Sequence, residues 1–235
     1  MNRIRRLLTA ASLLAVGVYL LNPSRALPET PLVQREPAVF FVIENGGTVQ
    51  NREEMIKNIN YLFGEATKWR RKRDTKGTII NVILTTNPTE VTWSGTPEQL
   101  YLQGHEVMEL IQFKPTCSDL RLAWKEVEQA TRSAMPVSLQ LIGVGPMIHA
   151  GFPCDEGETT IHLPQAVPDG LALGDLAMQA DRLLLVGVHA DQDEVYLDYL
   201  EHTGVLARVR AGKMRFDLLD NARARASRGS MLEDR

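Results

Sequence analysis

The chain has 235 residues, 44% of them apolar, which is enough to bury one core of ordinary domain size. Its 29 acidic and 26 basic side chains give a formal net charge of −3. Without residues 1–26, which contain four arginines and no acidic residue, 22 basic and 29 acidic side chains remain. This balance argues against a nucleic-acid partner, because binding to phosphates needs a positive surface that displaces counterions.

The first 26 residues differ from the rest of the chain. Three arginines among the first six residues precede an apolar run over 7–21, and Ser24-Arg25-Ala26 has the small residues that an export peptidase recognises. The pattern fits either a cleaved signal peptide or an uncleaved membrane anchor, although fifteen helical residues span only about 22 Å. We expect a periplasmic or extracellular domain, attached to the inner membrane if the segment is kept. Membrane contact is expected only through residues 1–26, and only if they are not cleaved.

The folded domain is predicted to cover 38–222, after a proline-rich linker over 27–37. Residues 38–43 are continuously apolar, which is typical of a strand buried on both faces. Polar residues follow at once, at Glu44, Asn45 and Thr48. Because open α/β sheets bind ligands at the carboxyl ends of central strands, these three residues are candidate binding residues.

The rest of the chain alternates between strand and helix patterns. Further strands are predicted over 78–85, 137–144 and 183–189, with a short extra strand over 90–93 and an edge strand over 205–209. Helices are predicted over 52–68, 97–103, 105–112, 118–133, 172–180 and 194–203. This order predicts a three-layer α/β domain, in which helices cover both faces of an open and mainly parallel sheet. Residues 223–235 contain too few apolar residues to pack and are predicted to be disordered.

A basic run over 69–73 stands out from the acidic domain. It comes near the end of the first predicted helix, where basic side chains complement the helix dipole, and this is the simpler interpretation. A patch for an anionic partner is the alternative.

The order of elements over 38–222 resembles that of a von Willebrand factor A-type domain. In that family the first strand ends in D-x-S-x-S, whose oxygens hold a divalent metal; here the same place reads Glu44-Asn45-Gly46-Gly47-Thr48. A later T-D-L-x-x-A-L-like segment of the family is matched by Ser118-Asp119-Leu120-Arg121-Leu122-Ala123-Trp124. The family's fourth strand ends in an aspartate, whereas this chain reads Gly143-Val144-Gly145-Pro146.

These differences weaken the metal site that the resemblance implies. Mg²⁺ and Ca²⁺ need several hard oxygens, and only Glu44, Thr48 and Ser118 keep a matching position. Asp119 or Asp155 is the substitute carboxylate in the alternative that keeps a metal. We expect a degenerate version with neither metal nor cofactor. Its candidate binding residues are Glu44, Asn45, Thr48, Ser118 and Asp119.

Two shorter motifs are weak. Gly143-Val144-Gly145 lacks the third glycine of a dinucleotide-binding turn. The segment 105–109 has a glutamate where a zinc-binding helix needs its second histidine.

Cys117 and Cys154 are the only cysteines, and in an exported protein they are predicted to form a disulfide between two loops at the carboxyl edge of the sheet. Two buried free thiols are the alternative.

The function expected from these patterns is that of an exported, non-catalytic protein-interaction module of the cell envelope. The alternative is an exported hydrolase, in which Glu44, Asp119 or Asp155 acts with a histidine of the loop around His149 to His162. A cleft with a perturbed carboxylate near a histidine would favour the enzyme. A surface without such a pair would favour the binding module.

Overall fold

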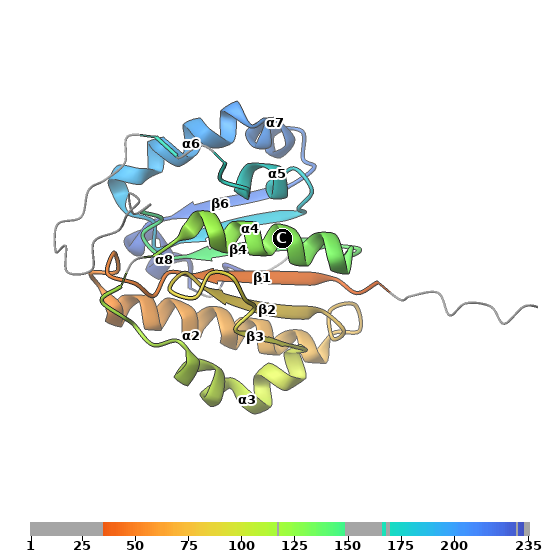
Figure 1. Ribbon diagram of the computed structural model, residues 1–235. Helices are drawn as coiled ribbons and strands as arrows, with labels where there is room; N and C mark the ends of the chain where they lie inside the picture. Colours follow the sequence, from red (N-terminus) through yellow and green to blue (C-terminus); the bar gives the residue numbers. More distant parts are fainter. Residues whose placement is uncertain (1–34, 117, 149–165, 168–169, 229, 233–235) are drawn as a thin grey trace, which may run out of the picture. The chain divides into compact units, whose positions relative to one another are not determined.

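A six-stranded sheet organises the residues described by the computed structural model, which are 35–116, 118–148, 166–167, 170–228 and 230–232 (Figure 1). All of them belong to one of the two units into which the chain divides, Arg35–Arg235. The strand order is β3-β2-β1-β4-β5-β6. The strands are β1 (Ala38–Ile43), β2 (Ile79–Leu84), β3 (Trp93–Gly95), β4 (Leu139–Val144), β5 (Arg182–Val186) and β6 (Arg215–Leu219). All neighbours pair in parallel except β3, which runs antiparallel to β2 at one edge.

Helices cover both faces of this sheet, so the predicted three-layer α/β fold is confirmed. The helices are α2 (Arg52–Lys68), α3 (Pro97–Leu110), α4 (Leu120–Ala134), α5 (Leu173–Ala177), α6 (Asp193–His202), α7 (Val205–Arg210) and α8 (Asn221–Ser227). Two short 3₁₀ helices, η1 (Trp69–Arg71) and η2 (Ala190–Gln192), precede β2 and α6. In Figure 1, α4, α5, α6 and α7 lie on one side of the sheet, and α2 and α3 lie on the other.

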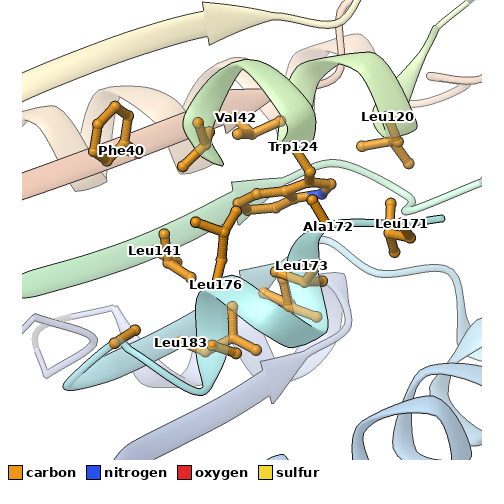
Figure 2. Packing of buried hydrophobic residues seen from close by; sticks show 14 of the residues in the cluster. Phe40, Val42, Leu120, Trp124, Leu141, Leu171, Ala172, Leu173, Leu176 and Leu183 are labelled. Carbon is orange, nitrogen blue, oxygen red and sulfur yellow. The ribbon is translucent and has the colours of Figure 1, made fainter. Parts of the chain in front are cut away.

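Strand β1 lies at the centre because its side chains are apolar on both faces. Phe40 and Val42 point into the layer of α4 and α5, where Trp124 and Leu176 pack against them (Figure 2). Phe41 points the opposite way and meets Phe63 of α2, edge to face, with ring centroids 5.2 Å apart. A strand without a polar residue on either face cannot occupy a sheet edge that faces water.

The structure differs from the predicted elements in three places. Residues 205–209, predicted as an edge strand, form helix α7, and the edge strand is β6. The two helices predicted over 97–103 and 105–112 are one helix, α3, since Gly104 does not interrupt it. The short extra strand lies at Trp93–Gly95 rather than over 90–93.

Residues 223–228 and 230–232 are described by the structure, and they differ from the disordered tail that was predicted over 223–235. Helix α8 packs on α2, and Met231 and Leu232 are buried in the same core layer. Arg228 donates hydrogen bonds to Glu54 at 2.5 Å and to Asn58 at 2.9 Å, both on α2. The hydrogen bonds of Arg228 and the burial of Met231 and Leu232 hold this segment on the domain, although the segment contains few apolar residues.

Several predictions fall outside the described residues. These concern the signal peptide or anchor, the linker over 27–34, the disulfide between Cys117 and Cys154, and the roles of Asp155, His149 and His162. They stay predictions. Within the described part of the chain, no helix combines the length and the apolar character needed to cross a membrane.

Candidate functional site

The strand order reverses direction between β1 and β4. From β1 the chain moves outward to β2 and β3, whereas from β4 it moves outward to β5 and β6 on the other side. Open α/β sheets bind ligands at such a switch point, beyond the carboxyl ends of the two strands. Glu44 directly follows β1, and Gly145, Pro146 and Met147 directly follow β4. The first predicted binding residue therefore lies where a ligand would be expected.

The side chain of Glu44 is fully enclosed at this point, with a relative exposure of 0%. Its Oε1 accepts a hydrogen bond from the backbone N–H of Met147, and the N–H of Ile148 also donates to the carboxyl group. Thr48 Oγ1 donates to Oε2 at 3.2 Å. The loop after β4 and the turn after β1 are thus held together by one carboxyl group.

Gly145 explains how the long Glu44 side chain fits. A Cβ atom added to Gly145 would lie 2.5 Å from Glu44 Cβ and 2.7 Å from Glu44 Oε1, much closer than non-bonded atoms approach. Gly145 also has a φ of +150°, which disfavours residues with a side chain. Gly145 and Glu44 are therefore complementary in shape.

Burial raises the pKa of Glu44 to about 8, and the N–H of Met147, the hydroxyl of Thr48 and the N–H of Ile148 lower it by less. The carboxyl group is therefore mostly protonated at neutral pH. Burial also raises the pKa of Tyr196 well above its usual value, and a negative charge on Glu44 adds to this effect. A neutral carboxyl group in this setting is a poor ligand for a divalent cation.

A chain of hydroxyl groups lies beside Glu44. Thr85 Oγ1 donates to Ser118 Oγ at 3.0 Å, and Thr48 Oγ1 lies 3.5 Å from the same atom. A Cβ atom at Gly46 would lie 2.6 Å from the carbonyl oxygen of Thr116. Position 46 therefore has no room for a serine side chain.

The other two predicted residues have structural partners. The side-chain Nδ2 of Asn45 donates to Thr86 Oγ1 and to the carbonyl of Gln112, each at 2.8 Å. It thereby connects the turn after β1 with the segments after β2 and α3. Asp119 caps α4, because its Oδ1 accepts from the N–H of Leu122 at 2.9 Å. Its Oδ2 is buried without a hydrogen-bond partner among the described residues.

Burial decides what these five residues can do. Glu44, Asn45 and Ser118 are at most 1% exposed and Asp119 is 8% exposed, whereas Thr48 is half-buried. Hydrogen bonds through Thr48, Ser118 and Thr85 connect Glu44 with Asn45, and Asp119 lies next to Ser118 in the chain. Four of the five predicted residues are too buried to touch a large partner.

A cavity of about 120 Å³ lies next to the network. Of the five predicted residues, Thr48 alone lines it. His189 in the loop after β5 and Asn221 at the start of α8 also line it. These two residues were missed by the sequence analysis. Their position directly beyond the carboxyl ends of strands was the available signal, and the misplaced β6 hid it for Asn221.

The described ranges contain no group of side chains of the kind that holds a metal ion. No group of three or more histidine, cysteine, aspartate or glutamate side chains comes together there. His189 Nδ1 accepts from the N–H of Asp191 at 3.3 Å and does not bond Glu44. No model of a known protein family matches the sequence, and a search of curated proteins found no match.

Proposed function

We propose that this protein is a non-catalytic protein-interaction module of the cell envelope, built as a degenerate von Willebrand factor A-type domain. The observation that carries the proposal is the enclosure of Glu44. The carboxyl group at the switch point is occupied by Met147, Ile148 and Thr48 of its own chain, so it supports the shape of the domain rather than chemistry on a substrate.

The metal-free form of the domain is part of this proposal. The two carboxyl oxygens of Glu44 accept hydrogen bonds from N–H and hydroxyl donors of the protein itself. Gly46 leaves no space for a second hydroxyl ligand. Both features favour a site closed by the protein itself over a site that recruits Mg²⁺ or Ca²⁺.

A partner needs an exposed surface, and the groove between α2 and α3 offers one. It has a volume of about 200 Å³. Its lining residues are mostly apolar or small: Asn60, Phe63, Gly64, Thr67, Leu100, Tyr101, Gly104 and Met108. Beside it, Tyr101 is 55% exposed and its neighbour Leu102 is 69% exposed.

Two glycines inside helices support the proposal that a second protein binds in this groove. Gly64 and Gly104 lie within α2 and α3, where glycine costs about 1 kcal/mol relative to alanine. A Cβ atom at either position would meet no described atom within 4 Å. Packing within the domain therefore does not require glycine, whereas an apolar helix or loop of a second protein could approach the two backbones closely at these positions.

Site-specific cross-linking tests the proposal. A photo-reactive residue at position 102 in the full chain should give one discrete cross-linked protein in the native envelope. The same residue at Leu197 of α6, which is also exposed, is the matched control and should not give this product. Gly64→Leu should abolish the product by filling the groove, and Gly64→Ala should weaken it while leaving the fold intact. Equal products from positions 102 and 197 would contradict the assignment of this surface.

One observation favours the hydrolase alternative. His189 and Thr48 line the same cavity, so an ester could meet an imidazole and a hydroxyl there. Ester hydrolysis by the purified chain that disappears in His189→Asn would establish the alternative and displace the binding module as the main function.

A further inference from the structure

The edge of the sheet opposite the candidate site is formed by the segments that precede the parallel strands. Because these strands all begin at one edge, the segments before them must lie there too. The segments are 35–37 before β1, 72–78 before β2, 135–138 before β4, 178–181 before β5 and 211–214 before β6. We call this surface the amino edge. In Figure 1 the start of β1 and the end of α4 lie at the same edge of the sheet.

Contacts between these segments show that they form one continuous surface. A Cβ atom at Gly77 would lie 2.9 Å from the carboxylate of Glu36, so the segments before β2 and β1 touch. Arg35, Met135 and Gln179 line one surface hollow of about 410 Å³, which joins the segments before β1, β4 and β5. The N–H of Arg215 donates to the carbonyl of Asp181 at 2.9 Å and adds the start of β6.

This surface gathers basic side chains in a chain that is acidic overall. Its exposed cations are Arg35, Lys72, Arg73, Lys76 and Lys213, together with Arg71 at the end of η1, directly before the segment 72–78. In the ranges that the structure covers, none of these six has a carboxylate within 4.0 Å, whereas Asp74 and Asp181 are the exposed acids nearby. The opposite, carboxyl edge exposes acidic side chains such as Glu53, Glu90 and Asp191 together with basic ones such as Arg52 and Lys114. The amino edge therefore carries a local excess of positive charge.

Exposed apolar side chains stand among these cations. Val137 is 64% exposed and Met135 is 53% exposed. Met135 also has a φ of +45°, the left-handed conformation that favours glycine or asparagine at a helix end. An exposed methionine in a strained conformation gains nothing from packing inside the domain, which points to a contact outside it.

We propose that the amino edge binds the surface of an anionic lipid bilayer. Six cations would face the lipid phosphates while Met135 and Val137 enter the headgroup layer, the combination by which peripheral proteins bind membranes. The position of the chain supports a bilayer over an acidic protein. The chain enters the domain at this edge, at Arg35, and the apolar run over 7–21 precedes it by only fourteen residues or so. This contact goes beyond the one expected for residues 1–26, and it rests on the proposed envelope location but not on the groove between α2 and α3.

Vesicle binding of the full chain tests the proposal. The probes are vesicles of phosphatidylcholine alone or mixed with phosphatidylglycerol. The test variant is Lys72→Glu/Arg73→Glu/Lys76→Glu. The matched control, Arg52→Glu/Lys57→Glu/Lys114→Glu, changes the net charge equally but alters exposed residues away from the amino edge. Each cation at an anionic surface contributes roughly fivefold, so the test variant should lose roughly a hundredfold in affinity for phosphatidylglycerol vesicles.

The first 34 residues are identical in the three proteins and contribute equally to binding. If the first 34 residues alone keep every variant bound to the vesicles, amide hydrogen exchange supplies a second measurement. Exchange should slow over 72–78 and 135–138 on phosphatidylglycerol vesicles, but not over 189–194 at the opposite edge. Equal losses in both triple variants, or unchanged exchange over 72–78, would overturn the proposal.

Met135→Asn separates lipid contact from folding. Asparagine suits the left-handed conformation, so this variant should be at least as stable to urea as the native chain. It should still bind phosphatidylglycerol vesicles more weakly, because an apolar contact is lost. Unchanged binding would show that Met135 does not touch the lipid and would reject the proposed orientation. None of these outcomes depends on the cross-linking at position 102.

Discussion

At the scale of single residues, Glu44 and Gly145 form one unit although they lie far apart in the sequence. Glu44 was predicted as a binding residue from its place after a buried strand, and that place is correct. Its enclosure could not be predicted, because it depends on the space that Gly145 leaves and on N–H groups that follow β4. Position in a fold can be read from local patterns, whereas the direction of a side chain depends on distant neighbours.

The raised pKa of Glu44 predicts how stability depends on pH. The unfolded chain loses the Glu44 proton near pH 4.5, whereas the folded chain keeps it to about pH 8. Stability should therefore be highest below about pH 4.5 with respect to this group, and should fall by up to roughly 5 kcal/mol as the pH rises to 8. Glu44→Gln keeps an acceptor for Met147 and should remove this loss. Urea unfolding of both proteins at pH 5 and pH 8.5 measures it, and parallel pH profiles would disprove the shift.

Gly145→Ala should destabilise the domain by about 2 to 3 kcal/mol, since the new methyl group would overlap Glu44 and the backbone has a positive φ. Gly64→Ala is the control, because its methyl group meets open space on a helix and should stabilise by up to about 1 kcal/mol. Urea midpoints give both values. A loss in both variants would show that alanine is tolerated at neither position and that the packing argument fails.

At the scale of elements, the strands that are largely apolar were predicted well. β1, β2, β4 and β5 each lie within or next to a predicted range, because burial on both faces leaves a run dominated by apolar residues. β6 was missed since its residues are all half-buried and include Asp217. Residues 205–209 contain apolar residues at a spacing that suits either a strand or one helical turn, and only Gly204, with a φ of +81°, decides for a new helix.

The contact between α8 and α2 gives a prediction at this scale. Arg228→Ala should destabilise the domain by about 1 to 3 kcal/mol, because the nearly buried Glu54 and Asn58 lose a charged donor. Arg225→Ala is the matched control. Its side chain is 60% exposed and its Nε lies 3.8 Å from the same carboxylate, so its removal should have an effect of less than about 1 kcal/mol. If urea midpoints move equally in the two variants, the segment after α8 is not a specific part of the fold.

At the scale of the whole molecule, the two edges of the sheet differ in what they expose. The carboxyl edge is closed by Glu44, whereas the amino edge exposes basic side chains together with Met135 and Val137. The sequence predicted Glu44, Asn45 and Thr48 at the first edge because they closely follow one strand. The second edge combines five separate segments, so it could not be found before the strand order was known.

The closed carboxyl edge predicts that divalent cations do not stabilise the molecule. Millimolar Mg²⁺ or Ca²⁺ should leave the melting temperature unchanged, because a cation that does not bind cannot stabilise the folded state. A bound cation would stabilise it progressively, with the logarithm of the cation concentration over Kd. A thermal melt series with increasing cation measures this. A saturating rise that disappears in Glu44→Ala would establish a metal site and reject the degenerate interpretation.

The bond between Arg228 and Glu54 also affects the order in which the chain can fold. The two residues are 174 positions apart, and the last described residues complete the layer in which α2 is buried. Contacts between the two ends of a chain form late and slow folding, because a long loop must close first. During synthesis, α2 lacks this cover until residues 228–232 have been made. We therefore expect nascent chains to stay incompletely folded until this segment has left the ribosome, and to become resistant to proteases only afterwards.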